Sequence, residues 1–155
     1  MKTIPLTQGK FAIVDDEDYD GLSTFHWRAT KTKSGGYAAR RGRDPVVYMH
    51  RQIMDAPKGM YVDHINHVQH DNRKVNLRVC TNSQNMQNGL KHKNGSSRYK
   101  GVYWYKPSKK WRAMIRVHGK GIHIGYFIDE VNAAKAYDEK AMQLFGEFAQ
   151  LNIAV

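Results

Sequence analysis

Met60-Tyr61-Val62-Asp63-His64-Ile65-Asn66 opens the stretch that decides the fold of this chain. It is a mainly apolar run that ends in an Asp-His pair, and a polar turn over residues 67–74 follows it. Residues 77–80, Leu-Arg-Val-Cys, alternate as a strand does. Thr81 with Gln84 then has the form of a capping box, which predicts a helix with Asn85 near its start. We therefore expect strand, turn, strand and helix over residues 60–89.

The same stretch carries side chains suited to metal-assisted cleavage of a phosphodiester. The reaction needs an attacking water, a base that deprotonates it and positive charge on the leaving oxygen. A neutral imidazole such as that of His64 is a suitable base near pH 7. Mg²⁺ prefers oxygen ligands and keeps several waters, so Asp63 and Asn85 suffice if the hairpin folds onto the helix. His64 would then face the phosphate, because neighbouring strand side chains point in opposite directions.

Residues 48–88 resemble the HNH homing endonucleases that phages and introns encode. The matching elements are Met49-His50-Arg51, Val62-Asp63-His64-Ile65-Asn66, Asp71-Asn72-Arg73, Asn76-Leu77-Arg78 and Asn85. The resemblance implies a strand–strand–helix (ββα-metal) nuclease core in which His64 is the general base. It also implies that Asp63 and Asn85 bind Mg²⁺ or another divalent ion such as Mn²⁺. Asn76 would brace the hairpin and orient the base, and cleavage would leave a 5′ phosphate and a 3′ hydroxyl.

For some residues near the expected catalytic site, the sequence allows two interpretations. Asn88 lies one helical turn after the expected helix ligand and is the alternative to it. Arg51 and Arg73 either contact the phosphate or anchor the structure. His67 and His70 lie in the turn, where we interpret them as solvated side chains rather than metal ligands.

The charge distribution makes a polyanion the expected partner. The formal net charge is +11, and residues 72–128 contain thirteen Lys/Arg and no acidic residue. Such a surface of one sign attracts phosphate groups. We therefore expect double-stranded DNA to bind there. The candidate contacts near the nuclease core and in the following linker are Arg51, Arg73, Arg78, Lys91 and Lys93.

The pattern changes after a linker rich in Lys, Asn, Gly and Ser at residues 90–97. Strands are expected over residues 99–105, 111–118 and 122–127, followed by a helix that Asp129 caps and Gly146 ends. All five acidic residues of the range 98–152 lie at or beyond Asp129, whereas eight Lys/Arg lie between residues 98 and 120. We therefore expect the helix to cover the back of the sheet, and the open face to meet phosphate.

Residues 96–152 resemble the Apetala-two, or ethylene-response-factor, DNA-binding domain. The matching residues are Tyr99-Lys100-Gly101-Val102, Trp111-Arg112-Ala113, Ile115-Arg116, Ile124-Gly125-Tyr126-Phe127, Ala133-Ala134, Ala136-Tyr137-Asp138 and Leu151-Asn152. In that family the sheet enters the major groove. The resulting candidate contacts are Lys100, Tyr103, Tyr105, Arg112, Arg116 and His123. Tyr103 and Tyr105 stand where the plant proteins have arginines, so the plant recognition sequence is not carried over. Trp104 and Trp111 are expected to serve core or hinge packing rather than base readout.

Residues 1–54 are expected to form a β-rich region. Strands are predicted over residues 11–14, 24–28, 37–40 and 46–49, with a short helix over residues 50–54. The acidic run 15–20 resembles the start of a calcium loop, but Trp27 stands where that loop needs its glutamate. We therefore predict an exposed turn for this run. The role of residues 1–47 stays open, and extra DNA contact through Arg40, Arg41 and Arg43 is one hypothesis for it.

The expected fold class is α+β, in four parts. They are a β-rich N-terminal region (1–54), an HNH nuclease core (48–89), a basic linker (90–97) and an Apetala-two-like domain (98–152). The last is a three-stranded antiparallel sheet packed on one helix. A single cysteine, Cys80, excludes an intrachain disulfide framework and a multi-cysteine zinc site, and it is expected in the core. Since we identify no signal peptide and no membrane-spanning run, we expect a cytoplasmic protein of a bacterial or phage-infected cell.

The function predicted from these patterns is that of a site-directed DNA endonuclease of the homing type. The alternative is a non-catalytic, sequence-specific DNA-binding regulator that retains the nuclease fold as a scaffold. An RNA-binding protein is disfavoured, because the paired aromatic motifs of a common RNA module are missing. Neither an obligate protein partner nor a membrane contact is expected. The target site, nicking versus double-strand cleavage, and monomer versus homodimer stay open.

Overall fold

The computed structural model describes residues 1–31, 36–42, 46–91 and 95–153. Its described part is a mixed α/β chain with four small sheets, which agrees with the predicted mixture of strands and helices. The chain divides into two compact units, Met1–Asn82 and Ser83–Val155. Two candidate DNA contacts, Arg43 and Lys93, lie outside the described residues.

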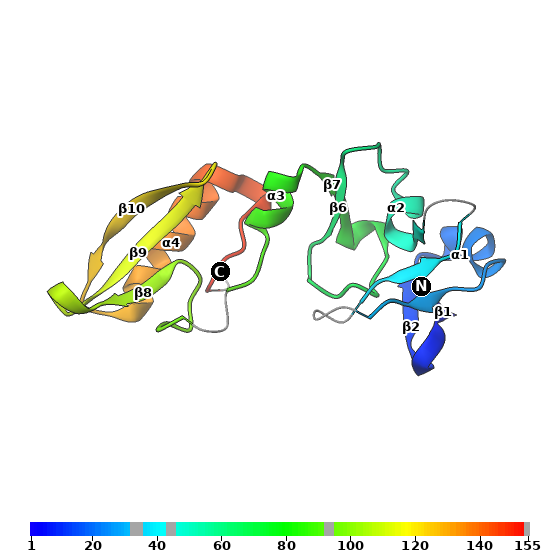
Figure 1. Ribbon diagram of the computed structural model, residues 1–155, viewed down its shortest axis with the longest axis horizontal. Coiled ribbons are helices and arrows are strands. Elements are labelled where there is room, and N and C mark those ends of the chain that lie inside the picture. Colours follow the sequence, from blue (N-terminus) through cyan, green and yellow to red (C-terminus); the bar gives the residue numbers. More distant parts are fainter. Residues whose placement is uncertain (32–35, 43–45, 92–94, 154–155) are drawn as a thin grey trace. The chain divides into compact units, whose positions relative to one another are not determined.

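The first unit begins with a hairpin and a small sheet (Figure 1). β1 (Lys2–Pro5) pairs antiparallel with β2 (Phe11–Val14), and the 3-10 turn η1 (Thr7–Gly9) lies between them. A three-stranded antiparallel sheet consists of β3 (Arg28–Ala29), β4 (Ala38–Arg40) and β5 (Val47–Tyr48). The short helix α2 (Met49–Ile53) follows β5 directly.

A hydrophobic core joins these pieces. Ala12 and Val14 of β2 are both fully buried, because alternate residues of a strand face the same side. Trp27 is also buried, and its indole N–H donates to the carbonyl of Leu22 at 2.8 Å. The cluster further contains Ile4, Leu6, Ala29, Ala38 and Met49. Since Met49 starts α2, its burial fixes the position of that helix.

Residues 16–20 of the acidic run are helical and Asp15 is the N-cap, so the predicted turn is wrong. α1 (Asp16–Ser23) has three carboxylates in its first turn, where the partial positive charge of the helix N-terminus stabilises them. Leu22 is buried and Tyr19 packs against the same core, which gives the helix an apolar side. Of the strand predicted over 24–28, only Arg28 belongs to a strand, which is β3, and β1 was not among the predicted strands.

The central hairpin completes the first unit. β6 (Tyr61–His64) pairs antiparallel with β7 (Leu77–Cys80), and the 3-10 turn η2 (Lys74–Asn76) precedes β7. The long turn between them is attached to β2, because the Ile13 amide donates to His70 O and the Asn72 amide donates to Ile13 O, each at 2.8 Å. The N-terminal strands therefore support the turn of the central hairpin. Cys80 is fully buried, as predicted.

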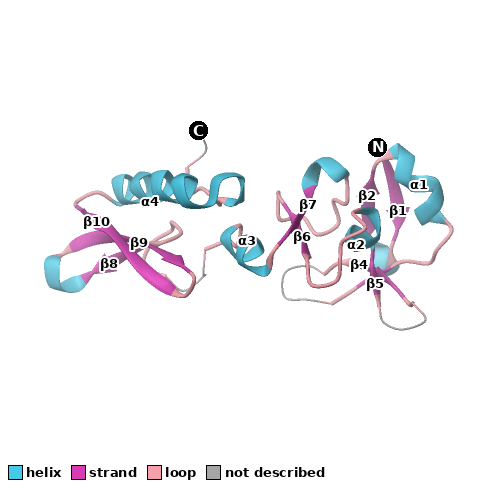
Figure 2. Ribbon diagram, turned by 90° about the horizontal axis from the view of Figure 1, so that it is seen from above, coloured by secondary structure: helices cyan, strands magenta, loops and turns pink. Residues whose placement is uncertain are grey.

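The second unit contains a sheet with one long helix. α3 (Asn82–Gln87) leads into it from the boundary, and the sheet has the order β10-β9-β8. Its antiparallel strands are β8 (Val102–Tyr105), β9 (Lys110–Val117) and β10 (Lys120–Phe127), with the 3-10 turn η3 (Lys106–Ser108) after β8. Figure 2 shows α4 (Glu130–Phe145) along one face of this sheet, before the 3-10 turn η4 (Gly146–Phe148).

Capping and packing fix α4 on the sheet. The Asp129 side chain accepts a hydrogen bond from the Asn132 amide at 2.9 Å, and Gly146 ends the helix with a φ of 52°. Small buried residues of α4 let it approach the sheet closely, and the larger Tyr137 lies beside them. The buried residues of the two elements are Val102, Ala113, Ile115, Ala133, Ala134, Tyr137 and Ala141.

Two details change which side chains reach the open face of this sheet. The pairing of β10 with β9 shifts register between His123 and Gly125, which is a β-bulge. Strict alternation is broken there, so Phe127 packs against the core while Tyr126 is 43% exposed. Trp104, predicted to serve core or hinge packing, is 40% exposed and packs edge-on against the partly buried Trp111, so it is not a core residue. No helix of the described residues has the length and apolar character of a membrane span.

Candidate active site

His64 ends β6 and is held by a buried carboxamide. Its side chain is 5% exposed, and its Nε2 lies 3.4 Å from Oδ1 of the fully buried Asn72. The Asn72 Nδ2 donates to His70 O at 3.3 Å, which turns Oδ1 toward the imidazole. An amide oxygen can only accept, so the contact favours the tautomer with its proton on Nε2. The lone pair of a neutral His64 is then on Nδ1.

The surroundings of His64 keep it neutral. Burial lowers its pKa below the ordinary value of 6.5, while the hydrogen bond with Asn72 and the charges of Asp63 and Asp71 act against that shift. The net direction is downward, so the imidazole is unprotonated at pH 7. A neutral imidazole with a fixed tautomer can accept a proton at Nδ1.

Asp63, the predicted metal ligand, is paired with Arg78 across the hairpin. Its side chain is 7% exposed, and Oδ2 accepts from Arg78 Nε at 3.0 Å and Nη2 at 2.8 Å. The two residues face each other in the register of β6 and β7. Arg78, predicted as a DNA contact, is itself only 11% exposed. Its guanidinium therefore neutralises the buried Asp63 carboxylate.

A second network pins the turn between the strands. The Asn76 side chain donates to Asp71 O at 2.8 Å and accepts from the Asn66 amide at 3.0 Å, so it ties both ends of the turn together. Arg73 donates to both Asp71 carboxylate oxygens at 2.7 Å. The Asn66 Nδ2 donates to Asp71 Oδ2 at 2.9 Å. Asn76 thus has the geometry of a brace, while the side chain that hydrogen-bonds the His64 ring is Asn72.

Arg51 has the contacts of a structural anchor. Its guanidinium donates to Met60 O at 2.6 Å, to Ala56 O at 3.0 Å and to Pro57 O at 3.1 Å. These bonds hold the loop that leads into β6. Of the two interpretations of Arg51 and Arg73, the described contacts support anchoring, and their contact with DNA stays a prediction.

Two aromatic neighbours of His64 come from the N-terminal part of the first unit. The rings of His50 and Tyr37 lie 5.1 Å and 5.8 Å from the His64 ring, measured between centroids. In the sequence, His50 belongs to the Met49-His50-Arg51 element that resembles the HNH endonucleases. Tyr37 was noted only as the start of a predicted strand, and no spacing rule connects it to the hairpin.

Asn85 and Asn88, the two possible helix ligands, belong to the second unit, whereas Asp63 belongs to the first. Asn85 is partly buried on α3, and Asn88 is 4% exposed just after it. Within the described ranges, no group of three or more His, Cys, Asp or Glu side chains is arranged to hold a metal. One carboxylate and one carboxamide oxygen still form a donor set that fits Mg²⁺.

The open face of the second unit carries an arginine among aromatic rings. Tyr103, Arg112 and Tyr126 are in register across the three strands. The Arg112 guanidinium carbon lies 5.6, 5.7 and 5.9 Å from the ring centroids of Tyr103, Tyr105 and Tyr126, and its Nε donates to His123 Nδ1 at 3.2 Å. Tyr126 was missed because the bulge reverses the alternation on which the prediction depended.

The other predicted DNA contacts of this unit lie near that face and near α3. Arg116 is exposed on β9. Lys100 donates from Nζ to Gln87 O at 2.6 Å, and burial lowers its pKa to about 8. Lys91 and Lys100 both line a hollow of about 480 Å³ that is otherwise mostly apolar, with Met86, Leu90, Tyr99 and Tyr103 among its walls.

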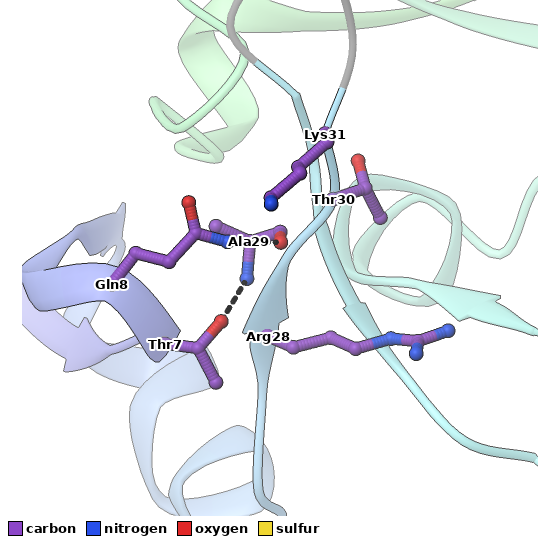
Figure 3. Close-up of a pocket in the computed structure, with 6 residues that line it drawn as sticks. All are labelled: Thr7, Gln8, Arg28, Ala29, Thr30 and Lys31. Atoms are coloured by element: carbon purple, nitrogen blue, oxygen red, sulfur yellow. Dashed lines mark hydrogen bonds between the residues drawn. The ribbon is translucent and has the colours of Figure 1, made fainter.

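A separate hollow lies in the first unit. It measures about 430 Å³ and is lined by Thr7, Gln8, Arg28, Ala29, Thr30 and Lys31 (Figure 3). The Ala29 amide donates to Thr7 Oγ1 at 3.1 Å, which joins η1 to β3. None of the predicted catalytic or metal residues lines this hollow. The candidate site is therefore the end of β6, not this hollow.

Known proteins have sequences similar to both halves of the chain. An HNH endonuclease family model matches residues 55–87. An uncharacterized HNH endonuclease, L560, of Acanthamoeba polyphaga mimivirus is 32% identical over 157 residues, which covers 94% of this chain and 76% of the relative. Protein 3.8 of Escherichia phage T7 is 33% identical over 76 residues, covering 46% of this chain and 63% of that protein.

A plant protein matches a shorter part. The AP2-like ethylene-responsive transcription factor TOE2 of Arabidopsis thaliana is 35% identical over 60 residues, which is 39% of this chain and 12% of the plant protein. No solved structure matches the chain significantly.

Proposed function

The chain belongs to the HNH endonuclease family, and from this premise we propose that it is a site-directed DNA endonuclease of the homing type. It hydrolyses a phosphodiester of double-stranded DNA with the help of a divalent metal ion. The observation that carries the proposal is the His64 imidazole, which is buried, neutral and held by Asn72 beside the Asp63 carboxylate.

The mechanism follows from the state of that imidazole. With its proton on Nε2, His64 accepts the proton of an attacking water at Nδ1, and Asn72 Oδ1 stabilises the Nε2–H of the resulting imidazolium. Asp63 lies next to it and adds a favourable negative charge. Asn76 keeps the turn that carries Asn72 in place through its bonds to Asp71 and Asn66.

Asp63 and Asn85 would hold the metal ion, with Asn88 as the alternative to Asn85. The donor set of one carboxylate and one amide oxygen suits Mg²⁺ or Mn²⁺, which keep several waters. When bound, such an ion supplies positive charge to the departing 3′ oxygen. Arg78 holds Asp63 in place while the carboxylate is buried in the hairpin.

The second unit is proposed to recognise the DNA with an Apetala-two-like sheet over residues 98–152. The partial similarity to a plant transcription factor supports this assignment, as does the arginine and tyrosine face on the side of the sheet opposite α4. Residues 48–89 would form the nuclease core, with residues 1–54 as the β-rich N-terminal region and residues 90–97 as the linker. The candidate DNA contacts are exposed Arg116 and His123, together with Arg112.

Cleavage of a supercoiled plasmid by the purified full chain tests the proposal. We expect nicking or linearisation with Mg²⁺ and none with EDTA. His64→Ala is expected to lose about 10²- to 10⁴-fold in rate, the usual contribution of a general base, while DNA affinity measured by fluorescence anisotropy stays unchanged. The matched control is His26→Ala, since His26 is exposed in the same unit and far from the proposed chemistry in sequence.

Two results would count against the assignment. If His64→Ala kept Mg²⁺-dependent cleavage, His64 would not be the base. If the wild-type chain bound the plasmid but cut it with neither Mg²⁺ nor Mn²⁺, the alternative of a non-catalytic DNA-binding regulator would be favoured. The partial similarity to a plant transcription factor is the observation that keeps this alternative under test.

A further inference from the structure

His50 is packed directly against the imidazole of His64. The two ring centroids are 5.1 Å apart and the rings meet edge to face at 75°. Tyr37 covers both histidines, with centroid distances of 5.0 Å to His50 and 5.8 Å to His64. The general base of the proposed reaction therefore has two flat rings against it, in addition to its hydrogen bond with Asn72.

The position of His50 is itself tightly determined. It is the second residue of α2, between fully buried Met49 and Arg51, which is anchored to the loop before β6 by three hydrogen bonds. The Tyr48 ring stacks on the His50 ring at 5.6 Å and 28°. Neither the backbone nor the ring of His50 can move without disturbing several neighbours. His50 is therefore suited to hold another side chain in place.

Stability alone gives a poor account of His50. The side chain is 7% exposed, and its Nδ1 is buried without a hydrogen-bond partner among the described residues. A buried polar atom without a partner costs about 1–3 kcal/mol, and an apolar ring at this position would avoid that cost. Burial also lowers the pKa of His50 to about 3, so the ring is neutral and does not repel a protonated His64.

We propose that His50 and Tyr37 are positioning residues, whose rings fix the ring plane of His64 so that its Nδ1 is held toward the attacking water. The inference rests on the proposed function, because it assigns His64 the role of base. It also gives the N-terminal part of the first unit a role in the reaction. That part supplies the surface against which the base is oriented, and β2 supports the turn that carries Asn72.

Four substitutions separate ring shape from the other properties of these side chains. His50→Ala and Tyr37→Leu remove a flat ring, which leaves His64 free to change rotamer. His50→Phe keeps a flat ring and removes the unpaired nitrogen, and Tyr37→Phe removes only a hydroxyl. Tyr61→Leu is the matched control, because Tyr61 is an aromatic residue of the same strand as His64 that is 45% exposed.

The first readout is the division of the effect between kcat and KM in plasmid cleavage. His50→Ala and Tyr37→Leu are expected to lower kcat by about 10- to 100-fold, as loss of an orienting neighbour does, with KM unchanged. The two Phe variants and Tyr61→Leu are expected to stay near the wild-type kcat. Circular dichroism and thermal melting identify any variant that fails to fold. If an Ala or Leu variant fails to fold, kcat is compared between the Phe variants and the wild type.

The second readout is independent of cleavage. NMR spectra of histidine labelled with ¹⁵N and ¹³C report the tautomer and the mobility of His64, which is assigned from the signal missing in His64→Ala. We expect a single Nε2–H tautomer in the wild type, and an averaged signal in His50→Ala and Tyr37→Leu. If the wild type cut no DNA, the proposed function would fail while this test of positioning would still stand.

The positioning role is overturned by any of three results. In the first, His50→Ala keeps the wild-type kcat and the wild-type His64 spectrum. In the second, KM rises as much as kcat falls, which would indicate a role in binding. In the third, His50→Phe loses as much kcat as His50→Ala, which would assign the effect to the ring nitrogen instead of the ring plane.

Discussion

At the scale of single residues, the Asp63 carboxylate has two possible cations. In the structure it accepts twice from Arg78, and both side chains are almost completely buried. A buried ion pair contributes little net stability, but removing one partner leaves an uncompensated charge at a high cost. A divalent ion bound to Asp63 would supply positive charge at the same carboxylate. The proposed ligand can therefore be tested through stability, without measuring cleavage.

Arg78→Met removes the guanidinium and keeps most of the apolar stem. In EDTA we expect it to lower the free energy of unfolding by about 3–5 kcal/mol, since the buried Asp63 carboxylate then loses the guanidinium with which it is paired. Mg²⁺ should restore part of this loss if Asp63 binds the ion. Thermal melting with and without Mg²⁺ measures the effect. Arg73→Met is the control, because it breaks the Asp71 pair in the turn, and its loss should not depend on Mg²⁺. Equal losses of Arg78→Met in EDTA and Mg²⁺ would contradict the assignment.

The candidate residues differ in how far the sequence could reveal them. Asp63 and His64 are adjacent on one strand, so their pattern is local and readable. Asn72 is within the quoted motif, but its role depends on β2, which holds its backbone through Ile13. Tyr37 is 27 positions from His64, and only folding brings the two rings to 5.8 Å. Side chains that meet only through tertiary contacts have no characteristic spacing in the sequence.

At the scale of elements, the sequence predicted those strands and helices that have a local pattern of alternation, capping or helical repeat. The elements that it missed have physical explanations. β6, β7 and α4 have alternation, a cap or a 3–4 residue repeat. α1 was missed because its acidic run is typical of a turn, although carboxylates also suit the first turn of a helix. A prediction based on strict alternation does not detect the bulge in β10. The bulge places Tyr126 on the open face of the sheet.

That face yields a prediction about Arg112, whose guanidinium lies among three tyrosines. Arg112→Gln should weaken binding to duplex DNA by about 1–3 kcal/mol, the usual value of a well-placed arginine contact. Fluorescence anisotropy at about 50 to 200 mM salt measures this, because phosphate contacts depend on salt. The control is Lys135→Gln, which removes the same charge from an exposed position on α4. Equal losses in the two variants would show that only net charge matters and would contradict sheet-face binding.

At the scale of the whole molecule, the two units differ in the groups whose pKa values folding shifts. In the first unit, burial lowers the pKa of His50 to about 3 and also lowers those of His64 and His70. In the second unit, burial lowers the pKa of Lys100 to about 8 and raises that of Tyr137 to about 12. Among the described residues, the histidines with shifted pKa values all lie in the first unit, so the units should respond differently to acid.

The first unit is expected to lose stability as the pH falls from 6.5 toward 3. In this window the unfolded chain protonates His50 at its ordinary pKa of 6.5, whereas the folded chain resists protonation. The unfolded state then binds more protons, so the free energy of unfolding decreases with decreasing pH. One pKa unit corresponds to about 1.4 kcal/mol, which makes the His50 contribution at most on the order of 5 kcal/mol. This is comparable to the whole stability of a small domain, about 5–15 kcal/mol.

NMR amide spectra recorded in steps from pH 7 to acid follow the two units separately. Signals of residues 1–82 should report unfolding at a higher pH than those of residues 83–155, because Lys100 and Tyr137 titrate well above this window. His50→Phe has no proton to gain, so it should reduce the acid sensitivity of the first unit. The remaining slope would then come from His64, His70 and the carboxylates, among which folding lowers the pKa of Asp71 through its bond with Arg73. An unchanged slope in His50→Phe would mean that burial of His50 does not govern the acid response.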